Sequence, residues 1–285
     1  MAIATSIEWT ESTWNPVTGC SKISAGCANC YAERMARRLK AVGVPNYANG
    51  FEVSLHEELL MLPLKWHKPK INFVNSMSDL FHEKIPDDFI ARIFDVMNRA
   101  SRHRFQILTK RSDRLSRMSP DLPWTDNLWM GVTVEDRKCA FRIEHLRKTR
   151  AFIKFISMEP LLEPIAELDL IDIDWVIVGG ESGPGARPLN EDWVIDIKEK
   201  CQTLNIPFFF KRELKELGFL LDMGKRGRKL IQKENLFREW VVAYPERLRQ
   251  KLILGRFKGE LDWWQHVRRP GSNLLITHPS LEKSA

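Results

Sequence analysis

The chain has 285 residues, of which 44% are hydrophobic and 28% charged, with 15 glycines and 15 prolines. This composition excludes collagen-like and disordered chains, and no apolar run approaches the length needed to cross a membrane. The formal charge of +7 comes from the last quarter: residues 211–285 hold 17 Lys and Arg against nine Asp and Glu, whereas residues 1–210 hold 27 against 28. The first residues show no basic and apolar signal region, so we expect a cytoplasmic protein.

Three cysteines stand close together in the run Gly19-Cys20-Ser-Lys-Ile-Ser-Ala-Gly-Cys27-Ala-Asn-Cys30-Tyr31. In a reducing cytosol, clustered cysteines indicate metal ligation and not disulfides. Three thiolates can hold three irons of a [4Fe-4S] cluster and leave the fourth iron open for another ligand. A structural zinc site would normally close with a fourth Cys or His nearby, and none follows promptly. Cys139 and Cys201 each stand alone in predicted helical stretches, where we expect buried apolar residues.

Short apolar runs rich in Val, Ile and Phe alternate with helix-like segments from residue 70 onward. The runs are 72–76, 105–109, 128–133, 153–157, 175–180 and 207–211, and a first unit would comprise the segment ending at Cys20 and a helix over 31–39. Such runs are typical of parallel strands covered on both faces. Successive runs end 24, 24 and 23 residues apart, at Thr109, Thr133, Ser157 and Gly180, which fits one strand and one crossover helix per unit.

Six or seven such units without a glycine-rich dinucleotide motif favour an α/β fold that is a partial or complete TIM-like (β/α) barrel. We expect this barrel domain over residues 1–212, with the three-cysteine loop near its beginning. Residues 213–285 lack the alternation and predict a mainly helical, basic appendage and tail.

The ligand site of such a barrel lies at the carboxyl ends of its strands. Ionisable and small polar residues recur there in step with the predicted strands. They are Ser76, Ser78, Asp79, Thr109, Lys110, Arg111, Thr133, Glu135, Ser157, Glu159, Glu181, Arg187 and Lys211. Ser, Thr and Asp are also ordinary helix N-caps, and a carboxylate beside a cation can be a structural ion bridge. Part of this set is therefore expected to have structural roles.

Longer motifs around these positions resemble the phage and bacterial three-Cys-motif family, over about residues 7–212. That family is largely uncharacterised, is similar to the radical S-adenosylmethionine superfamily, and is distantly similar to spore photoproduct lyase. The first cysteine gap holds six residues here, where that superfamily usually has three. The motifs that carry the resemblance are Trp14-Asn15-Pro16-Val-Thr-Gly19-Cys20, Cys27-Ala-Asn-Cys30-Tyr31-Ala, Ser78-Asp79-Leu80-Phe81, Leu108-Thr109-Lys110-Arg111, Gly131-Val-Thr-Val-Glu135, Ser157-Met-Glu159-Pro160 and Gly179-Gly180-Glu181-Ser182-Gly183 with Arg187-Pro188.

The resemblance implies a radical S-adenosylmethionine enzyme whose [4Fe-4S] cluster is held by Cys20, Cys27 and Cys30. Reductive cleavage of S-adenosylmethionine would then give a 5′-deoxyadenosyl radical, with a flavodoxin or ferredoxin as reductant. Ser76 and Ser78 stand where the superfamily contacts the methionine amino group, and Thr133 or Glu135 where it contacts the ribose. The residues expected to face the substrate or the methionine carboxylate are Glu159, Glu181, Arg187 and Lys211, of which the two glutamates and the lysine are the catalytic candidates and Arg187 a cofactor contact.

The basic C-terminal region favours nucleic acid or a nucleotide as the substrate, because basic clusters such as 224–229 often contact phosphates; a solvated surface explains the same charge equally well. A second basic group, which includes Arg111 and Arg114, surrounds the predicted strand end at Thr109. No membrane partner is expected.

Two alternatives stay open. One is a zinc-bearing nucleic-acid-binding protein without redox chemistry, with a distant His such as His56 or His82 as the fourth ligand. The other is a hydrolase that holds Mg²⁺ or Mn²⁺ through carboxylates, namely Asp79, Glu135, Glu159 and Glu181.

Overall fold

A computed structural model of the chain describes residues 3–5 and 7–211, which belong to the first of two compact units, residues 1–245. The predicted appendage and tail over 213–285 lie outside the described residues. None of the helices in the described ranges is long and apolar enough to cross a membrane.

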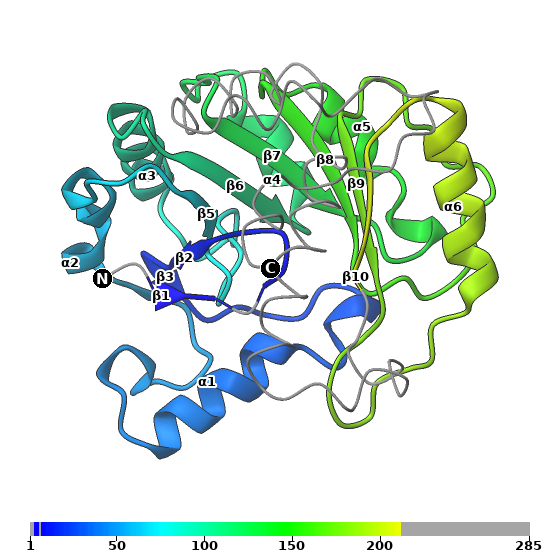
Figure 1. Cartoon of the computed structure of the whole chain (residues 1–285). Coiled ribbons are helices and arrows are strands. Elements are labelled where there is room, and N and C mark those ends of the chain that lie inside the picture. The colour runs from blue at the N-terminus through cyan, green and yellow to red at the C-terminus, as the bar shows by residue number, and fades with distance from the viewer. Residues whose placement is uncertain (1–2, 6, 212–285) are drawn as a thin grey trace, which may run out of the picture. The chain divides into compact units, whose positions relative to one another are not determined.

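The centre of the described fold is one sheet in the order β1-β2-β5-β6-β7-β8-β9-β10 (Figure 1). Within this sheet, the strands from β2 to β10 run parallel and curl into a half-barrel, and β1 pairs antiparallel with β2. The predicted partial TIM-like α/β fold is confirmed. The strands are β1 (Ile3–Ala4), β2 (Ser12–Trp14), β5 (Ile71–Val74), β6 (Arg104–Thr109), β7 (Leu128–Thr133), β8 (Ile153–Met158), β9 (Trp175–Gly179) and β10 (Phe208–Lys211), and a separate hairpin pairs β3 (Val17–Thr18) with β4 (Ser54–Leu55).

Helices connect most of the parallel strands and cover one face of the sheet. Helix α3 covers the sheet with an apolar face. The residues of this face recur at a spacing of three and four and are all buried, namely Phe89, Ile90, Ile93, Phe94 and Met97. Acidic residues stand in its first turn and Arg99 in its last, as the helix dipole favours. The α helices are α1 (Tyr31–Ala41), α2 (Glu57–Leu60), α3 (Asp87–Arg99), α4 (Ser112–Met118), α5 (Arg142–Arg147) and α6 (Glu191–Thr203).

The two faces of the sheet carry different side chains because successive strand residues point to opposite sides. The helix-facing side contributes aliphatic and aromatic residues such as Phe105, Ile107, Val132 and Ile156 to the main core. The opposite, concave side holds a cluster of aromatic rings. The ring centroid of Trp175 lies 5.6 Å from that of Phe155 and 6.4 Å from that of Trp129, and the centroids of Trp9 and Phe73 lie 4.6 Å apart. Both sides of the half-barrel are therefore packed below its carboxyl edge.

The predicted strands from residue 71 onward agree with the structure, and two details differ. The first parallel strand ends at Trp14 and not at Cys20, because Asn15-Pro16 follows it and a proline donates no ladder hydrogen bond; Val17 and Thr18 turn away to pair with β4. No helix crosses from β8 to β9 in the described segment 159–174, which contains Pro160 and Pro164. Its buried leucines and isoleucines cover the sheet in irregular conformation.

Candidate functional site

The three cysteines lie on one loop between β3 and α1, beside the carboxyl edge of the sheet. The loop begins at Gly19, whose amide donates to the Met77 carbonyl oxygen over 2.9 Å, while the amide of Cys20 donates to Phe51 over 3.1 Å. Gly19 has φ +84°, and a β-carbon there would lie 2.1 Å from the carbonyl oxygen of Glu52. Only glycine fits this approach, so the backbone fixes the place of the first cysteine.

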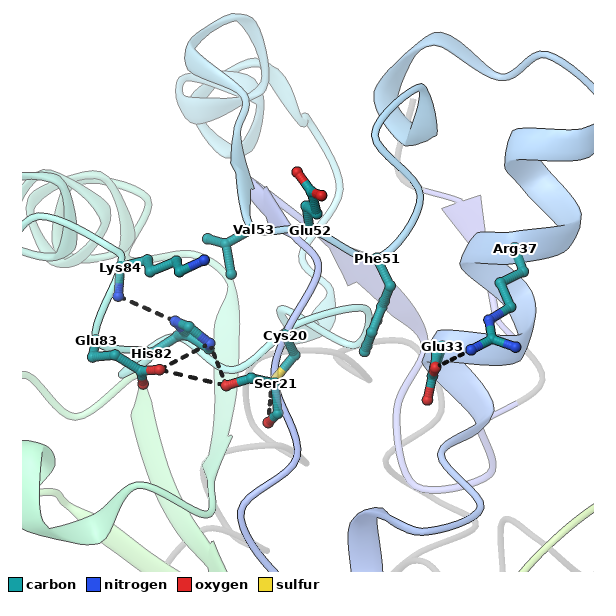
Figure 2. A pocket seen from close by; sticks show the side chains of 10 residues that line it. All are labelled: Cys20, Ser21, Glu33, Arg37, Phe51, Glu52, Val53, His82, Glu83 and Lys84. Atoms are coloured by element: carbon teal, nitrogen blue, oxygen red, sulfur yellow. Dashed lines mark hydrogen bonds and ion pairs between the residues drawn. The ribbon is translucent and has the colours of Figure 1, made fainter.

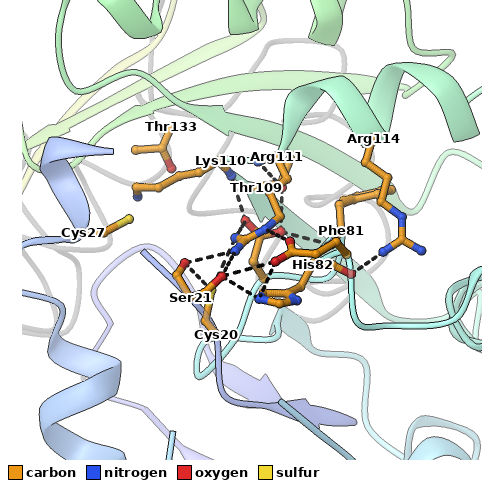
Figure 3. A network of polar contacts seen from close by, with 12 residues as sticks. Cys20, Ser21, Cys27, Phe81, His82, Thr109, Lys110, Arg111, Arg114 and Thr133 are labelled. Carbon is orange, nitrogen blue, oxygen red and sulfur yellow. Dashed lines mark hydrogen bonds and ion pairs between the residues drawn. The ribbon is translucent and has the colours of Figure 1, made fainter. Parts of the chain in front are cut away.

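Arg111, two residues after the end of β6, anchors the beginning of the loop (Figure 3). Its guanidinium donates to the Cys20 sulfur over 3.4 Å and to the backbone and side-chain oxygens of Ser21 over 3.0 and 2.9 Å. The same group pairs with Asp79 at 3.3 Å and with Glu83 at 3.0 Å, and its side chain is only 8% exposed. Arg114 is also turned inward, toward the carbonyl oxygens of His82 and Ile85. The guanidinium groups of these two arginines therefore bind oxygens of the protein itself.

Asp79 is a structural hub and not a free carboxylate. Its oxygens accept hydrogen bonds from the Thr109 hydroxyl at 2.6 Å and from the amides of Phe81 and Lys110 at 3.0 Å, besides the Arg111 guanidinium. Burial and the Asp79 charge raise the pKa of the Cys20 thiol to about 11, and Arg111 opposes this rise. The loop after β5 and the end of β6 are thereby joined around Cys20.

Glu135, which follows β7, anchors the middle of the cysteine loop. Its carboxylate accepts a hydrogen bond from Ser24, and a β-carbon at Gly26 would lie 2.9 Å from its Oε1. The side chain is fully buried and pairs with Arg142 of α5 at 2.7 Å. The predicted contact between Glu135 and a ribose is untested, and the observed partners of this carboxylate belong to the protein.

Glu181 and Arg187 anchor the end of the loop. Glu181 accepts from the Asn29 side-chain amide at 2.8 Å and forms a two-pronged ion pair with Arg187, whose guanidinium also donates to the Ala25 carbonyl oxygen at 2.8 Å. The hydrogen bonds from Arg187 and Asn29 lower the pKa of Glu181 to about 2, although burial works in the opposite direction. These two residues, predicted to face the substrate or the methionine carboxylate, hold the loop at Ala25 and Asn29, on either side of Cys27.

The three cysteines are half-buried and belong to one loop. Figure 3 shows the Cys27 sulfur and the Lys110 side chain pointing toward one another, with Thr133 beside them. Cys27 lies 3.7 Å from the Ser24 hydroxyl, and Cys30 precedes α1 directly. No three His, Cys, Asp or Glu side chains of residues 3–5 and 7–211 converge as ligands of one metal ion. Three thiolates are donors of the kind that an iron–sulfur cluster takes, and in a cubane each of them binds a different iron.

Ser76 and Ser78 lie under the loop, where they connect backbone segments. The Ser76 hydroxyl donates to the Asn15 side chain and the Ser78 hydroxyl to the Val17 carbonyl oxygen, each over 3.1 Å. Tyr31 donates its own hydroxyl to the Ser76 carbonyl oxygen. Since both serine protons are used within the protein, these hydroxyls keep their lone pairs for a ligand that donates, such as an ammonium group.

A second polar group lies at the ends of β8, β9 and β10. Glu159 pairs with Lys211 at 3.2 Å and accepts from Ser157 at 3.1 Å. A β-carbon at Gly179 would lie 3.2 Å from the Glu159 side chain and 3.3 Å from that of Lys211, so the pair lies directly over the glycine. Ser157 is in register with Thr133. Burial of the Tyr31 hydroxyl and the nearby Cys30 and Glu159 raise the pKa of Tyr31.

Lys110 was expected at a strand end, but it was given no role in binding a cofactor or substrate. It is half-buried, and within the described ranges no carboxylate lies at ion-pair distance from its ammonium group. The sequence feature that marks Lys110 as a site residue is its position directly after Thr109, the last residue of β6, and next to Arg111, which contacts Cys20. A cation that points toward Cys27, with no carboxylate of residues 3–5 and 7–211 at ion-pair distance, suits an anionic ligand.

A cleft of about 420 Å³ lies on the outer flank of the loop (Figure 2). Phe51 and Val53 give it apolar walls, Lys84 and Arg37 stand at its two sides, and Cys20 forms part of its floor. His82 also lines it, with its Nε2 2.9 Å from the Ser21 hydroxyl and its Nδ1 accepting from the Lys84 amide at 3.1 Å. Solvent therefore reaches Cys20 from this side.

The residues of the two alternative metal sites are dispersed. His56 is 2.8 Å from the Thr18 hydroxyl and His82 is bonded to Ser21, so both histidines have protein partners. The four carboxylates of the alternative magnesium or manganese site each pair with a different cation, in the pairs Asp79–Arg111, Glu135–Arg142, Glu159–Lys211 and Glu181–Arg187. Cys139 and Cys201 are buried, as predicted.

Comparisons with known proteins give a family but no activity. Residues 4–234 match a family model described as "Protein of unknown function (DUF5131)". Residues 229–268, outside the described residues, match a model described as "Transcriptional regulator, AbiEi antitoxin, Type IV TA system". No curated protein matches the chain significantly. The resemblance to the three-Cys-motif family stays a prediction.

Several solved structures of spore photoproduct lyase are similar to this chain. A cysteine-to-alanine mutant with dinucleoside spore photoproduct matches with a TM-score of 0.47 at 8% identity, covering 74% of this chain and 78% of its own. A double mutant with bound AdoMet and dinucleoside spore photoproduct matches with a TM-score of 0.42 at 10% identity, covering 86% and 76%. These likenesses are too distant to carry a statement about chemistry.

Proposed function

We propose that this chain, which belongs to the DUF5131 family, is a radical S-adenosylmethionine enzyme that binds a [4Fe-4S] cluster through Cys20, Cys27 and Cys30 and acts on nucleic acid or a nucleotide. The observation that carries the proposal is a loop with three thiols, held beside the carboxyl edge of a parallel half-barrel by Arg111, Glu135 and the Glu181–Arg187 pair. Three thiolates leave one iron of a cubane open for a chelating ligand. When bound, such a cluster supplies the electron that cleaves S-adenosylmethionine to a 5′-deoxyadenosyl radical.

The chain's own residues provide binding groups for the parts of S-adenosylmethionine. The ammonium group of Lys110 suits the methionine carboxylate, because opposite charges attract strongly where water is partly excluded. The lone pairs of Ser76 and Ser78 suit the methionine amino group, and Thr133 suits a ribose hydroxyl. The role of these residues is to orient the ligand and to keep water out, while the hard bond cleavage belongs to the cofactor.

The Glu159–Lys211 pair is the candidate for substrate contact. Its two charges lie at neighbouring strand ends over Gly179. Glu181, the other catalytic candidate, is better explained as an anchor of the loop, because its oxygens accept from Asn29 and Arg187. A nucleic-acid substrate is supported by the excess of 17 basic over nine acidic residues in 211–285 and by the match of 229–268 to a transcriptional-regulator model.

The test is an absorption spectrum with iron and sulfide analysis on anaerobically purified protein. We expect a brown protein with about four irons per chain, and loss of iron in a variant with Cys20, Cys27 and Cys30 all changed to Ala. Cys139→Ala serves as the matched control, since it removes a buried cysteine outside the loop and should keep the iron. The cluster-loaded protein should release 5′-deoxyadenosine under reduction, supplied by a flavodoxin, a ferredoxin or a chemical reductant. A colourless protein that stays free of iron after reconstitution would contradict the proposal, and stoichiometric zinc would favour the zinc alternative.

A further inference from the structure

The three thiols of the cysteine loop have different surroundings. Cys20 accepts a hydrogen bond from the Arg111 guanidinium over 3.4 Å. Cys27 has the Ser24 hydroxyl at 3.7 Å, and Cys30 packs beside a small apolar cluster of Ala32, Ala36 and Met77. Among the described residues, a guanidinium contacts the sulfur of Cys20 alone of these three.

Arg111 is held in place so firmly that it has little freedom to turn away from this sulfur. Asp79 and Glu83 take two of its N–H groups, and Ser21 takes further ones through its carbonyl and hydroxyl oxygens. Asp79 is itself fixed by Thr109 and by backbone amides. The guanidinium thus stands at the meeting point of β6, the loop after β5 and the cysteine loop.

An N–H group that points at a cluster sulfur stabilises the reduced state more than the oxidised state, because reduction adds negative charge. The positive charge of Arg111 acts in the same direction, although Asp79 and Glu83 offset part of it. A lysine would keep the charge but would lose the planar fork that reaches Asp79, Ser21 and Cys20 together.

We propose that Arg111 is a positioning residue that fixes Cys20 as a cluster ligand and raises the reduction potential of the bound cluster through its N–H···S contact. This inference rests on the proposed function, since it concerns the cluster that the three cysteines would hold. It assigns to Arg111 a role that is separate from binding S-adenosylmethionine or substrate. The buried carboxylate of Asp79 keeps the Arg111 guanidinium oriented.

The experiment is a redox titration of the cluster-loaded full chain, followed by electron paramagnetic resonance, for wild type, Arg111→Lys and Arg111→Gln. We expect the glutamine variant to make reduction about tenfold less favourable, which is ~59 mV for a one-electron step. The lysine variant should show a smaller shift in the same direction. Arg147→Gln is the matched control, because Arg147 is 15% exposed and pairs with Glu144 and Asp169 without contacting a cysteine; its potential should equal that of wild type.

Removal of Arg111 leaves Asp79 buried without its cation, so the glutamine variant can lose its fold. The double variant Asp79→Asn/Arg111→Gln removes both charges and should still show a downward shift in potential, smaller than that of Arg111→Gln because the negative charge of Asp79 is also lost. Equal potentials in wild type, Arg111→Lys and the double variant, each with full iron content, would overturn the inference and leave the proposed function intact. A wild-type chain that holds no cluster would instead overturn the proposed function itself.

Discussion

The carboxylate of Glu181 accepts a hydrogen bond from the side-chain amide of Asn29 over 2.8 Å, across 152 residues of sequence. Asn29 stands between Cys27 and Cys30, and Glu181 stands just beyond β9. The two ends of the described half-barrel are therefore joined through the cysteine loop. Arg187 strengthens this connection, since it binds both Glu181 and the Ala25 carbonyl oxygen.

Protonation of Glu181 should weaken this connection at low pH. The pKa of Glu181 in the folded chain is lowered to about 2 from a reference value of 4.5, mainly by Arg187, so its stabilising contribution is fully present above pH 4.5 and is lost as the pH falls toward 2. We expect a contribution on the order of 2 kcal/mol. Urea unfolding of wild type and Glu181→Gln across this range checks it: the difference between them should be largest above pH 4.5 and should shrink below it. A constant difference would contradict the assignment.

Replacement of Glu135 by glutamine should strongly destabilise the fold. The carboxylate is fully buried and compensates the buried Arg142 guanidinium, so its neutralisation leaves an unpaired buried cation. We expect a loss of roughly 3–5 kcal/mol in the free energy of unfolding. Glu144→Gln is the control, since Glu144 is 61% exposed and pairs with Arg147 at the surface; it should cost less than about 0.5 kcal/mol. Equal losses in the free energy of unfolding for Glu135→Gln and Glu144→Gln, measured by urea denaturation, would contradict the prediction.

Alanine at Gly19 should cost far more than alanine at Gly43. Both glycines have positive φ, so both substitutions carry a backbone penalty of about 1 kcal/mol. A β-carbon at Gly43 meets no atom within 4 Å, whereas one at Gly19 would lie 2.1 Å from the Glu52 carbonyl oxygen. We expect a total loss of roughly 3–5 kcal/mol for Gly19→Ala, together with lower iron content because Cys20 is displaced. Thermal unfolding and iron analysis of both variants measure this, and similar melting temperatures would argue against it.

Lys110→Met should weaken the binding of S-adenosylmethionine without loss of the cluster. The methionine side chain keeps the length but removes the ammonium group that points toward Cys27 and Thr133. Loss of one charge-assisted hydrogen bond should reduce affinity about tenfold or more. Calorimetric titration of the cluster-loaded protein checks this, with the exposed Lys148→Met as control. Unchanged affinity would place the carboxylate of the cofactor elsewhere.

The strands could be predicted from the sequence because strands of a parallel sheet that are buried on both faces appear as continuous apolar runs. Runs such as 128–133 are apolar throughout, and the regular spacing of their ends indicates strand-and-helix units. The crossing from β8 to β9 has the same spacing but no helix. The spacing of the strand ends gives the number of residues between two strands but not their conformation, so the absence of a helix in the segment 159–174 could not be predicted.

The contacts between the charged residues at the strand ends and the cysteine loop were not predictable. The sequence predicted Glu135, Glu181 and Arg187 at the strand ends and assigned them to a ligand, whereas the structure shows each of them bound to the loop. Their observed partners, Ser24, Asn29 and Ala25, lie more than 100 residues away in the chain. Only the curvature of the sheet brings these groups together, and no local pattern encodes that curvature.

The hydrogen bonds of the cysteine loop have a consequence for repair after oxidative damage. Zinc fingers lose their fold with their metal because the metal holds the chain together. Here Arg111, Glu135, Glu181 and Arg187 hold the loop through oxygen atoms of the protein, besides one contact to a sulfur. We therefore expect a chain stripped of its iron by air to stay folded, with its thiols in place for a new cluster. Such a protein can be reloaded without being synthesised again.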